Sequence, residues 1–297
     1  MSESRDYARL GCAAFGKALV ASRDLDPVYV AVHRAELPSD QRARLLVAYW
    51  CLYHLGTAAR LSELKEHAFW GELATAAENA HSPFLPKHAG GRWPRGTERR
   101  HWRGAQAVTS FQSVLEKAKC GRDYRPSAEH LVDWLGSGKT FAKVTQHVLQ
   151  LRGFGPWIAF KVADMLERCA DYRVDFVDCH LGFYDEPRKG AWLYANERKR
   201  KPFPYESMSL TMVGMMTHKL LGEVGRQFAP PDMRRKLNVQ EAETIFCKWK
   251  SHLHGHYALG KDTREVYHGL HGWGAVADLM RIHLAKLPYA PRKGEHR

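Results

Sequence analysis

The chain has 297 residues, of which 44% are hydrophobic, so it is long enough and apolar enough to fold around a sizeable core, which excludes a largely disordered protein. Lysine and arginine number 45 against 32 acidic residues, and the formal net charge of +13 favours a polyanionic partner such as nucleic acid. No apolar run approaches the roughly 20 residues of a membrane span and no secretory leader is recognisable, which predicts a cytoplasmic protein without a membrane partner.

Helical spacing of apolar residues dominates the first third of the chain. After a Pro-Ser-Asp start signal, the stretch from Leu37 to Leu64 has this spacing and predicts a core helix. The segment 81–104 breaks the pattern with three prolines and four glycines, and it predicts a long basic loop that leads into a helix over 105–118. A loop of this length is typical of a functional or a disordered segment.

Helical patterns return in the middle and at the end of the chain. They predict helices over 127–136 and 141–151, and around 207–225, 239–253 and 263–285. Residues 182–207 are interpreted as an irregular, strongly basic connector, and the best of the few strand signals is YRVDFV at 172–177. These patterns predict a mainly α protein with two lobes, divided along the sequence into a helical region (1–105), a core (106–185) and a C-terminal region (186–297).

The stretch LRGFGPWIA, residues 151–159, is typical of a turn between two helices. Gly153 and Gly155 permit backbone angles closed to other residues, and Pro156 suits the first turn of a helix because its missing N–H has no partner there. The amides at the start of this helix, with Lys161 one turn further on, suit a phosphate oxygen. An ordinary connection between helices explains the turn equally well.

Asp178 follows the turn within the sequence VDCH, residues 177–180. Asp175 is the alternative candidate for a functional aspartate after the turn. Turn and aspartate together resemble the helix-hairpin-helix superfamily of DNA glycosylases, whose hairpin has the approximate pattern L-P-G-[VI]-G-x-[KW]-T-A and whose essential aspartate follows about twenty residues later. The matching hairpin positions are Leu151, Gly153, Phe154, Gly155, Trp157 and Ala159. The resemblance implies a two-lobed helical fold in which the hairpin contacts DNA and the acid meets a flipped-out base. Alternatively, either aspartate caps the next helix.

The hairpin departs from that pattern at three positions. Arg152 replaces the proline, Ile158 replaces the threonine, and Trp157 stands where strand-cutting members carry a lysine. Without that amine, a Schiff-base mechanism is not expected.

Three further stretches, 23–56, 99–104 and 247–262, resemble the bacteriophage α-glutamyl/putrescinyl-thymine pyrophosphorylases, also called amino acid:DNA transferases. This resemblance implies substitution at an exocyclic carbon of double-stranded DNA that contains a modified pyrimidine. Pyrophosphate leaves a pyrophosphorylated 5-hydroxymethyluracil while an amine from an amino acid or polyamine attacks the methylene. The alternatives are a monofunctional DNA glycosylase, which cleaves the N-glycosidic bond, and a DNA-binding module without catalysis.

Amine substitution requires cations for the leaving group. Pyrophosphate is highly anionic, so Arg99, Arg100 and Arg103 around His101 are predicted to clamp its oxygens. The basic run at 196–204 is typical of a solvated charged surface, but across DNA it would add sequence-independent affinity.

Amine substitution also requires a base, because only the neutral amine attacks. Asp178 is the first candidate, followed by His254, and Asp175 is retained as the rival of Asp178. Phe154 and Trp157 at the hairpin, with Trp102 on the basic loop, suit stacking or wedging at unpaired bases, although aromatic residues more often belong to a core.

The segment CKWKSHLHGHY contains Cys247, His252, His254 and His256 close together in sequence. On a helix this spacing distributes them over different faces, so no metal site is predicted. Lys250 and Tyr257 are interpreted as donors to a phosphate, a carboxylate or the uracil edge. No cofactor is certain; Mg²⁺ is compatible because it bridges phosphates, but no carboxylate cluster indicates a site for it.

Overall fold

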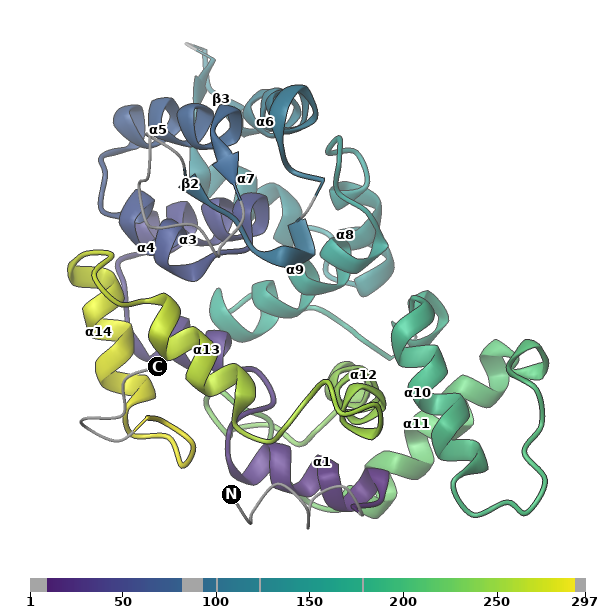
Figure 1. Ribbon diagram of the computed structural model, residues 1–297. Coiled ribbons are helices and arrows are strands. Elements are labelled where there is room, and N and C mark those ends of the chain that lie inside the picture. The colour runs from purple at the N-terminus through teal and green to yellow at the C-terminus, as the bar shows by residue number, and fades with distance from the viewer. Residues whose placement is uncertain (1–9, 82–92, 100, 123, 178, 292–297) are drawn as a thin grey trace. The chain divides into compact units, whose positions relative to one another are not determined.

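The computed structural model describes residues 10–81, 93–99, 101–122, 124–177 and 179–291, and these are mainly α-helical (Figure 1). The predicted mainly α class is therefore confirmed. Within the described residues no helix is both long and apolar enough to cross a membrane. None of the six cysteines forms a disulfide, and four of them are buried.

The chain divides into two compact units. Unit 1 combines the described residues up to Val30, from Asp175 to Glu265 and from Leu284 onward, and unit 2 combines Ala31–Val174 with Val266–His283. Each unit takes residues from more than one of the three regions delimited along the sequence. Helix α2 (Pro27–Arg34) and helix α13 (Lys261–Gly269) each begin in unit 1 and end in unit 2.

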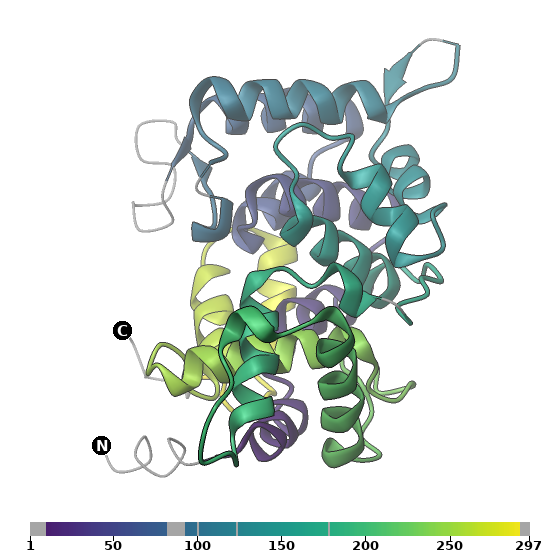
Figure 2. The same cartoon turned by 90° about the vertical axis from the view of Figure 1, so that its right-hand side faces the viewer.

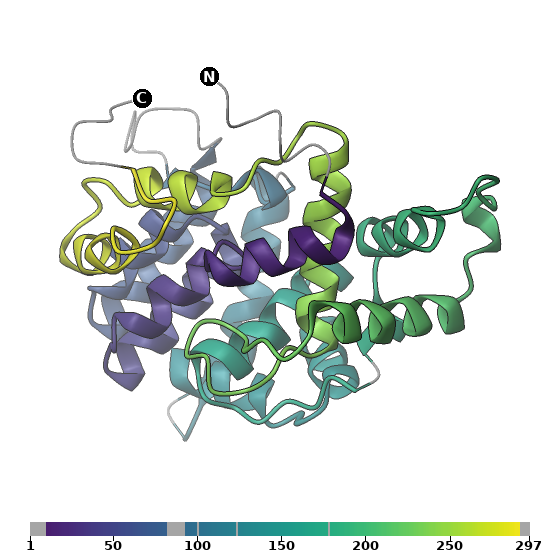
Figure 3. The same ribbon diagram turned by 90° about the horizontal axis from the view of Figure 1, so that it is seen from below.

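Unit 1 is built around helix α12 (Val239–Leu253), which α1 (Cys12–Ala21) and α10 (Asp185–Asn196) contact. Figure 3 shows α1, in purple, beside α12. A capping box starts α12, since Asn238 and Glu241 satisfy each other's backbone amides. The elements of unit 1 are α1 (Cys12–Ala21), a 3-10 helix (Cys179–Gly182), α10 (Asp185–Asn196), a 3-10 helix (Tyr205–Ser207), α11 (Leu210–Val224) and α12 (Val239–Leu253).

Unit 2 is built around helix α3, whose residues from Ala43 to Leu52 are all buried. It packs against α4, α5, α7 and α9. Figure 2 shows α6 leading directly into the antiparallel pair β3–β4. The elements are α3 (Ser39–Leu52), α4 (Leu55–Ser62), α5 (Glu66–Glu78), β1 (Ala80–His81), β2 (Trp93–Pro94), a 3-10 helix (Thr97–Arg99), α6 (Gly104–Ala118), β3 (Lys119–Cys120), β4 (Arg125–Pro126), α7 (Ala128–Gly136), α8 (Phe141–Val148), α9 (Pro156–Cys169) and most of α14 (Ala275–Leu284).

Several elements differ from the expectation. The single helix predicted over 37–64 is two helices, because Tyr53 adopts a left-handed conformation at φ +52° and the His54 side chain then caps α4. The predicted connector at 182–207 contains α10, and 263–285 is divided between α13 and α14. Residues 172–177 form no strand, since only Asp175 makes a bridge within an otherwise extended connection.

Candidate functional site

The predicted hairpin is present in unit 2, where α8 packs against α9 across the turn at 149–155. Gly153 lies at φ +74°, and a Cβ there would come within 2.3 Å of the Ser110 hydroxyl oxygen, so the position accepts only glycine. Gly155 and Pro156 are exposed at the start of α9. The first amides of α9 therefore lie at the surface, at the positive end of the helix dipole.

Arg99 is buried beside this turn with 7% of its surface exposed. Its guanidinium donates to the carbonyl oxygens of Cys51 at 3.0 Å and Gly153 at 2.9 Å. It also lies 4.7 Å from the ring centroid of Trp102 and 4.6 Å from that of Phe154. Burial lowers the pKa of Arg99 to about 10, and its Nη2 atom has no hydrogen-bond partner among the described residues. Arg99 thus ties the turn to the end of α3 and still has an unused donor.

Arg95 lies in the same stretch of chain, residues 95–103, which we call the arginine segment. It is 8% exposed, and in the described part of the chain its Nε atom makes no hydrogen bond. Burial and the nearby charge of Arg103 lower the pKa of Arg95. Arg103 and His101 are exposed, whereas Arg100 lies outside the described residues. The prediction from sequence omitted Arg95, although it belongs to the same basic run.

Three aromatic rings, those of Tyr49, Tyr53 and Trp157, form a ladder from α3 to the start of α9. The ring centroids of Tyr49 and Tyr53 are 4.6 Å apart, and those of Tyr53 and Trp157 are 4.8 Å apart. A Cβ at Gly96 would come within 2.3 Å of the Tyr53 carbonyl oxygen, so the arginine segment packs directly on the end of α3. A left-handed conformation is uncommon for a tyrosine and is typical of a constrained site.

Lys161 is turned inward at this ladder, with only 9% of its surface exposed. Burial, Tyr53 and Glu98 raise the pKa of Tyr49 well above its ordinary value, and the charge of Lys161 partly opposes them. An ammonium and a carboxylate thus lie close to one buried phenol. Sequence reasoning missed Tyr49 and Tyr53, although their i,i+4 spacing places them on one face of a helix.

Of the two candidate aspartates, Asp175 belongs to unit 1, and Asp178 lies outside the described residues. Asp175 is exposed, and its Oδ1 atom accepts the amide hydrogen of Val177 at 2.9 Å. This bond is a local turn contact of the kind that capping aspartates make. Nearby, a Cβ at Gly214 would come within 2.9 Å of the His180 ring, so α11 approaches the VDCH segment closely.

The chain is similar to known proteins over most of its length. The model of a protein family described as amino acid:DNA transferase matches residues 16–258. The chain belongs to this family. It is 38% identical over 296 residues to a glycinyltransferase of Pseudomonas phage PaMx11, with 96% of this chain and 98% of the relative covered. It is 26% identical over 285 residues to a putrescinyltransferase of Delftia phage PhiW-14, with 91% and 81% covered.

The matched range includes both the hairpin of unit 2 and most of the described part of unit 1. In the transferase, several polar side chains of the segment 247–262 form hydrogen bonds or ion pairs within unit 1. Lys250 forms an ion pair with Glu186, and the Nδ1 atom of the exposed His254 lies 2.7 Å from the carbonyl oxygen of Lys250. The buried Tyr257 donates to Asp24 at 2.6 Å. No group of three potential metal ligands occurs in the part of the chain that the structure describes.

Asp24 connects the beginning of the chain to this part of the transferase. It is fully buried, and its carboxylate accepts hydrogen bonds from the Tyr257 hydroxyl, the Gly260 amide, and both the amide and hydroxyl of Thr263 at 2.6 to 2.9 Å. A buried carboxylate is stable only when its oxygens are satisfied in this way. The polar groups of this segment therefore stabilise the fold of unit 1.

Proposed function

We propose that this transferase replaces the pyrophosphate of a pyrophosphorylated 5-hydroxymethyluracil in double-stranded DNA with the amino group of an amino acid. The nitrogen lone pair forms a bond to the exocyclic methylene carbon, the carbon–oxygen bond to pyrophosphate breaks, and a base takes the proton that the nitrogen loses. The relative named glycinyltransferase is more similar to the chain than the one named putrescinyltransferase, at 38% against 26% identity, which favours an amino acid over a polyamine.

The observation that carries this proposal is the buried, incompletely satisfied guanidinium of Arg99 beside the exposed amides of the hairpin. A buried cation is costly unless an anion compensates it, and pyrophosphate or a DNA phosphate supplies that charge. Arg95 and Arg103 would add further donors, with Arg100 and His101 in the same segment. Arginine suits this role because it keeps its charge when it is desolvated.

The hairpin is proposed to hold the DNA backbone in a helix-hairpin-helix, glycosylase-like fold. The exposed Gly153 and Gly155 leave room for a phosphate at the start of α9. Trp157 would contact the extruded nucleotide, with the ring of Tyr53 behind it. Phe154 is buried against Arg99 and Trp102 and would support the turn from within. The inward-facing Lys161 would bind the base or its pyrophosphate rather than the outer backbone.

Asp178 is the preferred base for the incoming amine. Asp175 already accepts the amide hydrogen of Val177, so one of its oxygens is engaged in a local turn. His254 and the donors Lys250 and Tyr257 would then support the site through unit 1 rather than contact the substrate. We propose that the reaction takes place in the cytoplasm of a bacterial host, and the phage origin of both relatives supports this location. Mg²⁺ would be held by the pyrophosphate itself, if it takes part.

A direct assay tests the reaction. The protein is incubated with DNA that carries the pyrophosphorylated base and with a panel of amino acids and polyamines, and the DNA is digested to nucleosides for mass spectrometry. We expect a thymidine bearing the amino acid, and Asp178→Asn should lower the rate at least about 100-fold while Asp175→Asn has a smaller effect. Abasic sites in place of that product would identify a glycosylase, and binding without product would identify a DNA-binding module.

A further inference from the structure

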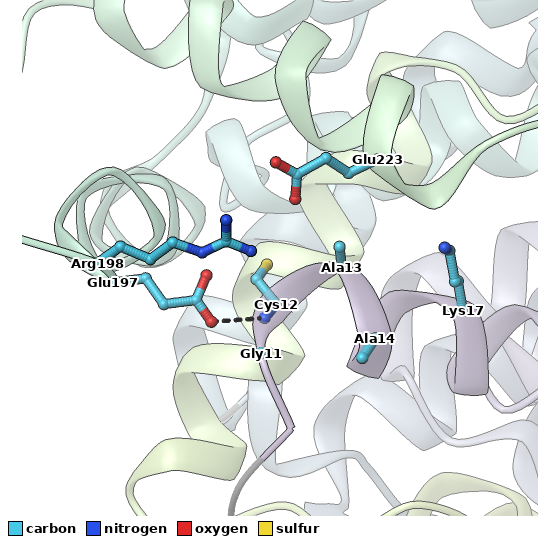
Figure 4. A pocket seen from close by; sticks show the side chains of 8 residues that line it. All are labelled: Gly11, Cys12, Ala13, Ala14, Lys17, Glu197, Arg198 and Glu223. Atoms are coloured by element: carbon cyan, nitrogen blue, oxygen red, sulfur yellow. Dashed lines mark hydrogen bonds between the residues drawn. The ribbon is translucent and has the colours of Figure 1, made fainter.

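Unit 1 contains a pocket of about 480 Å³ that lies far along the chain from the hairpin and that the reaction proposed above does not use. The first two turns of α1, the residues that follow α10 and the last turn of α11 line it, and it is open to solvent (Figure 4). Two acids, Glu197 and Glu223, and two bases, Lys17 and Arg198, line this pocket. Their formal charges cancel, which suits a ligand that carries one charge of each sign.

Glu197 is held in place by the start of α1. Its Oε1 atom accepts the amide hydrogen of Cys12 at 3.2 Å, as Figure 4 shows. A Cβ at Gly11 would come within 2.6 Å of the same oxygen, so the close approach requires glycine there. Glu197 therefore occupies the helix end, and the remaining acid of the pocket is Glu223.

Glu223 has a weakly held carboxylate with a buried phenol beside it. It forms an ion pair with Lys219 at 3.8 Å, and Lys219 is itself half exposed. The side chain of Tyr194 is only 3% exposed. Burial, a hydrogen bond with Glu223 and the proximity of Cys12 and Glu197 raise the pKa of this phenol, so its hydroxyl lies beside the acidic residues that line the pocket.

The thiol of Cys12 lies in the pocket wall but is not reactive. It is fully buried, and burial together with Glu197 and Glu223 raises its pKa well above the ordinary value. A thiol held in its neutral form is a poor nucleophile. The pocket is therefore suited to reversible binding and not to covalent attachment of a ligand.

We infer that this pocket binds a small amino acid in its zwitterionic form, with the ammonium group at Glu223 and Tyr194 and the carboxylate at Arg198. An anion alone would meet two carboxylates, and a simple amine would leave Arg198 and Lys17 without a counterion. This inference rests on the proposed function insofar as the bound amino acid is the molecule that is transferred.

Binding is tested by calorimetry on the whole protein without DNA, so the result does not depend on transfer. Glycine should bind, whereas methylamine, which lacks the carboxylate, and N-acetylglycine, which lacks the ammonium group, should bind at least about 10-fold more weakly. Glu223→Gln and Arg198→Gln should each weaken glycine binding by about 10-fold or more. Glu206→Gln, a change at an exposed residue elsewhere in unit 1, is the matched control.

Tyr194→Phe provides a second test, because the ring remains packed on Phe246 and only the hydroxyl is removed. It should weaken glycine binding about 5-fold without lowering the unfolding temperature. Unchanged glycine affinity in Glu223→Gln, or no glycine binding by the wild-type protein at millimolar concentration, would overturn the inference.

The transfer assay separates the two proposals. If the pocket delivers the co-substrate, Glu223→Gln should raise KM for the amino acid about 10-fold and leave both KM for DNA and kcat within about 2-fold. Glycine that binds but never enters the nucleoside product would support the pocket as a site for an amino acid that regulates the enzyme. An amino-substituted product formed without glycine binding in the pocket would leave the proposed function standing and contradict this inference.

Discussion

Lys248 in unit 1 and Arg99 in unit 2 are both largely buried cations, but their surroundings differ in one respect. Lys248 lies 2.6 Å from a carboxylate oxygen of Asp262 and donates to the Asp24 carbonyl oxygen. Although burial opposes its charge, Asp262 and Asp24 raise its pKa above the ordinary value. Arg99 instead donates to two carbonyl oxygens and stacks on aromatic rings, and burial lowers its pKa to about 10.

This contrast distinguishes buried charges that are paired within the protein from a buried charge that a bound anion would pair. Around Asp24, hydroxyl and amide donors satisfy both carboxylate oxygens. We call the segment 247–262 saturated, because the donors that it directs at Asp24 already have their acceptor. Around Arg99, dipoles of carbonyl groups and rings compensate only part of a full charge. We therefore expect changes at Asp24 to act on stability alone and changes in the arginine segment to act on substrate selection as well.

The largest effect is expected for Asp24→Ala, because four donors lose their acceptor in a buried environment. The free energy of unfolding should fall by about 4 kcal/mol in urea titrations followed by circular dichroism. Glu206→Ala, at an exposed position, should change it by less than about 0.5 kcal/mol. If Asp24→Ala retained wild-type stability, the description of a saturated segment would be wrong.

Arg99→Gln should have the next largest effect. It weakens the bonds to Cys51 and Gly153 and should lower the free energy of unfolding by about 2 to 3 kcal/mol. Arg103→Gln is its partner experiment, since Arg103 is exposed and its change should leave stability intact. That variant should lose about 10-fold of its preference for pyrophosphorylated over ordinary duplex in competition binding. Equal losses for both duplexes would identify Arg103 as a backbone contact.

Tyr257→Phe is a smaller change in the saturated segment, because it removes only one of the four donors to Asp24. Removing one hydroxyl from Asp24 should lower the free energy of unfolding by about 1 kcal/mol, measured by thermal and urea unfolding. The transfer rate below the unfolding transition should stay the same, because the hydroxyl is already used within unit 1. A fall in kcat at unchanged stability would instead show that Tyr257 contacts the substrate.

The smallest effect concerns the pH dependence of Lys248. Because its pKa is raised in the folded protein, its stabilising contribution is fully present below the unfolded value of about 10.4 and is lost as pH rises through the folded value. The difference in free energy of unfolding between wild type and Lys248→Met should therefore shrink above about pH 10. A difference that grows with pH would contradict the pairing with Asp262.

Much of the helical architecture could be predicted from local sequence patterns. Ser127 caps α7 and Asn238 caps α12 as their residue types suggest, and Gly153 and Pro156 form the expected turn before α9. The division between α3 and α4 could not be predicted in this way. It depends on a left-handed tyrosine whose carbonyl lies against Gly96, more than forty residues later in the chain.

The sequence alone determined the mainly helical class, the hairpin turn and the resemblance to transferases acting on DNA, because periodicity, capping and glycine requirements are local properties of the chain. Only the tertiary structure decided which polar groups are free to act. Asp24 and Tyr257 are separated by 233 positions, and their hydrogen bond exists only because the fold of unit 1 brings them together. Burial and long-range pairing determine whether a charged group stabilises the fold or can contact a substrate. Neither property follows from the type of a single residue.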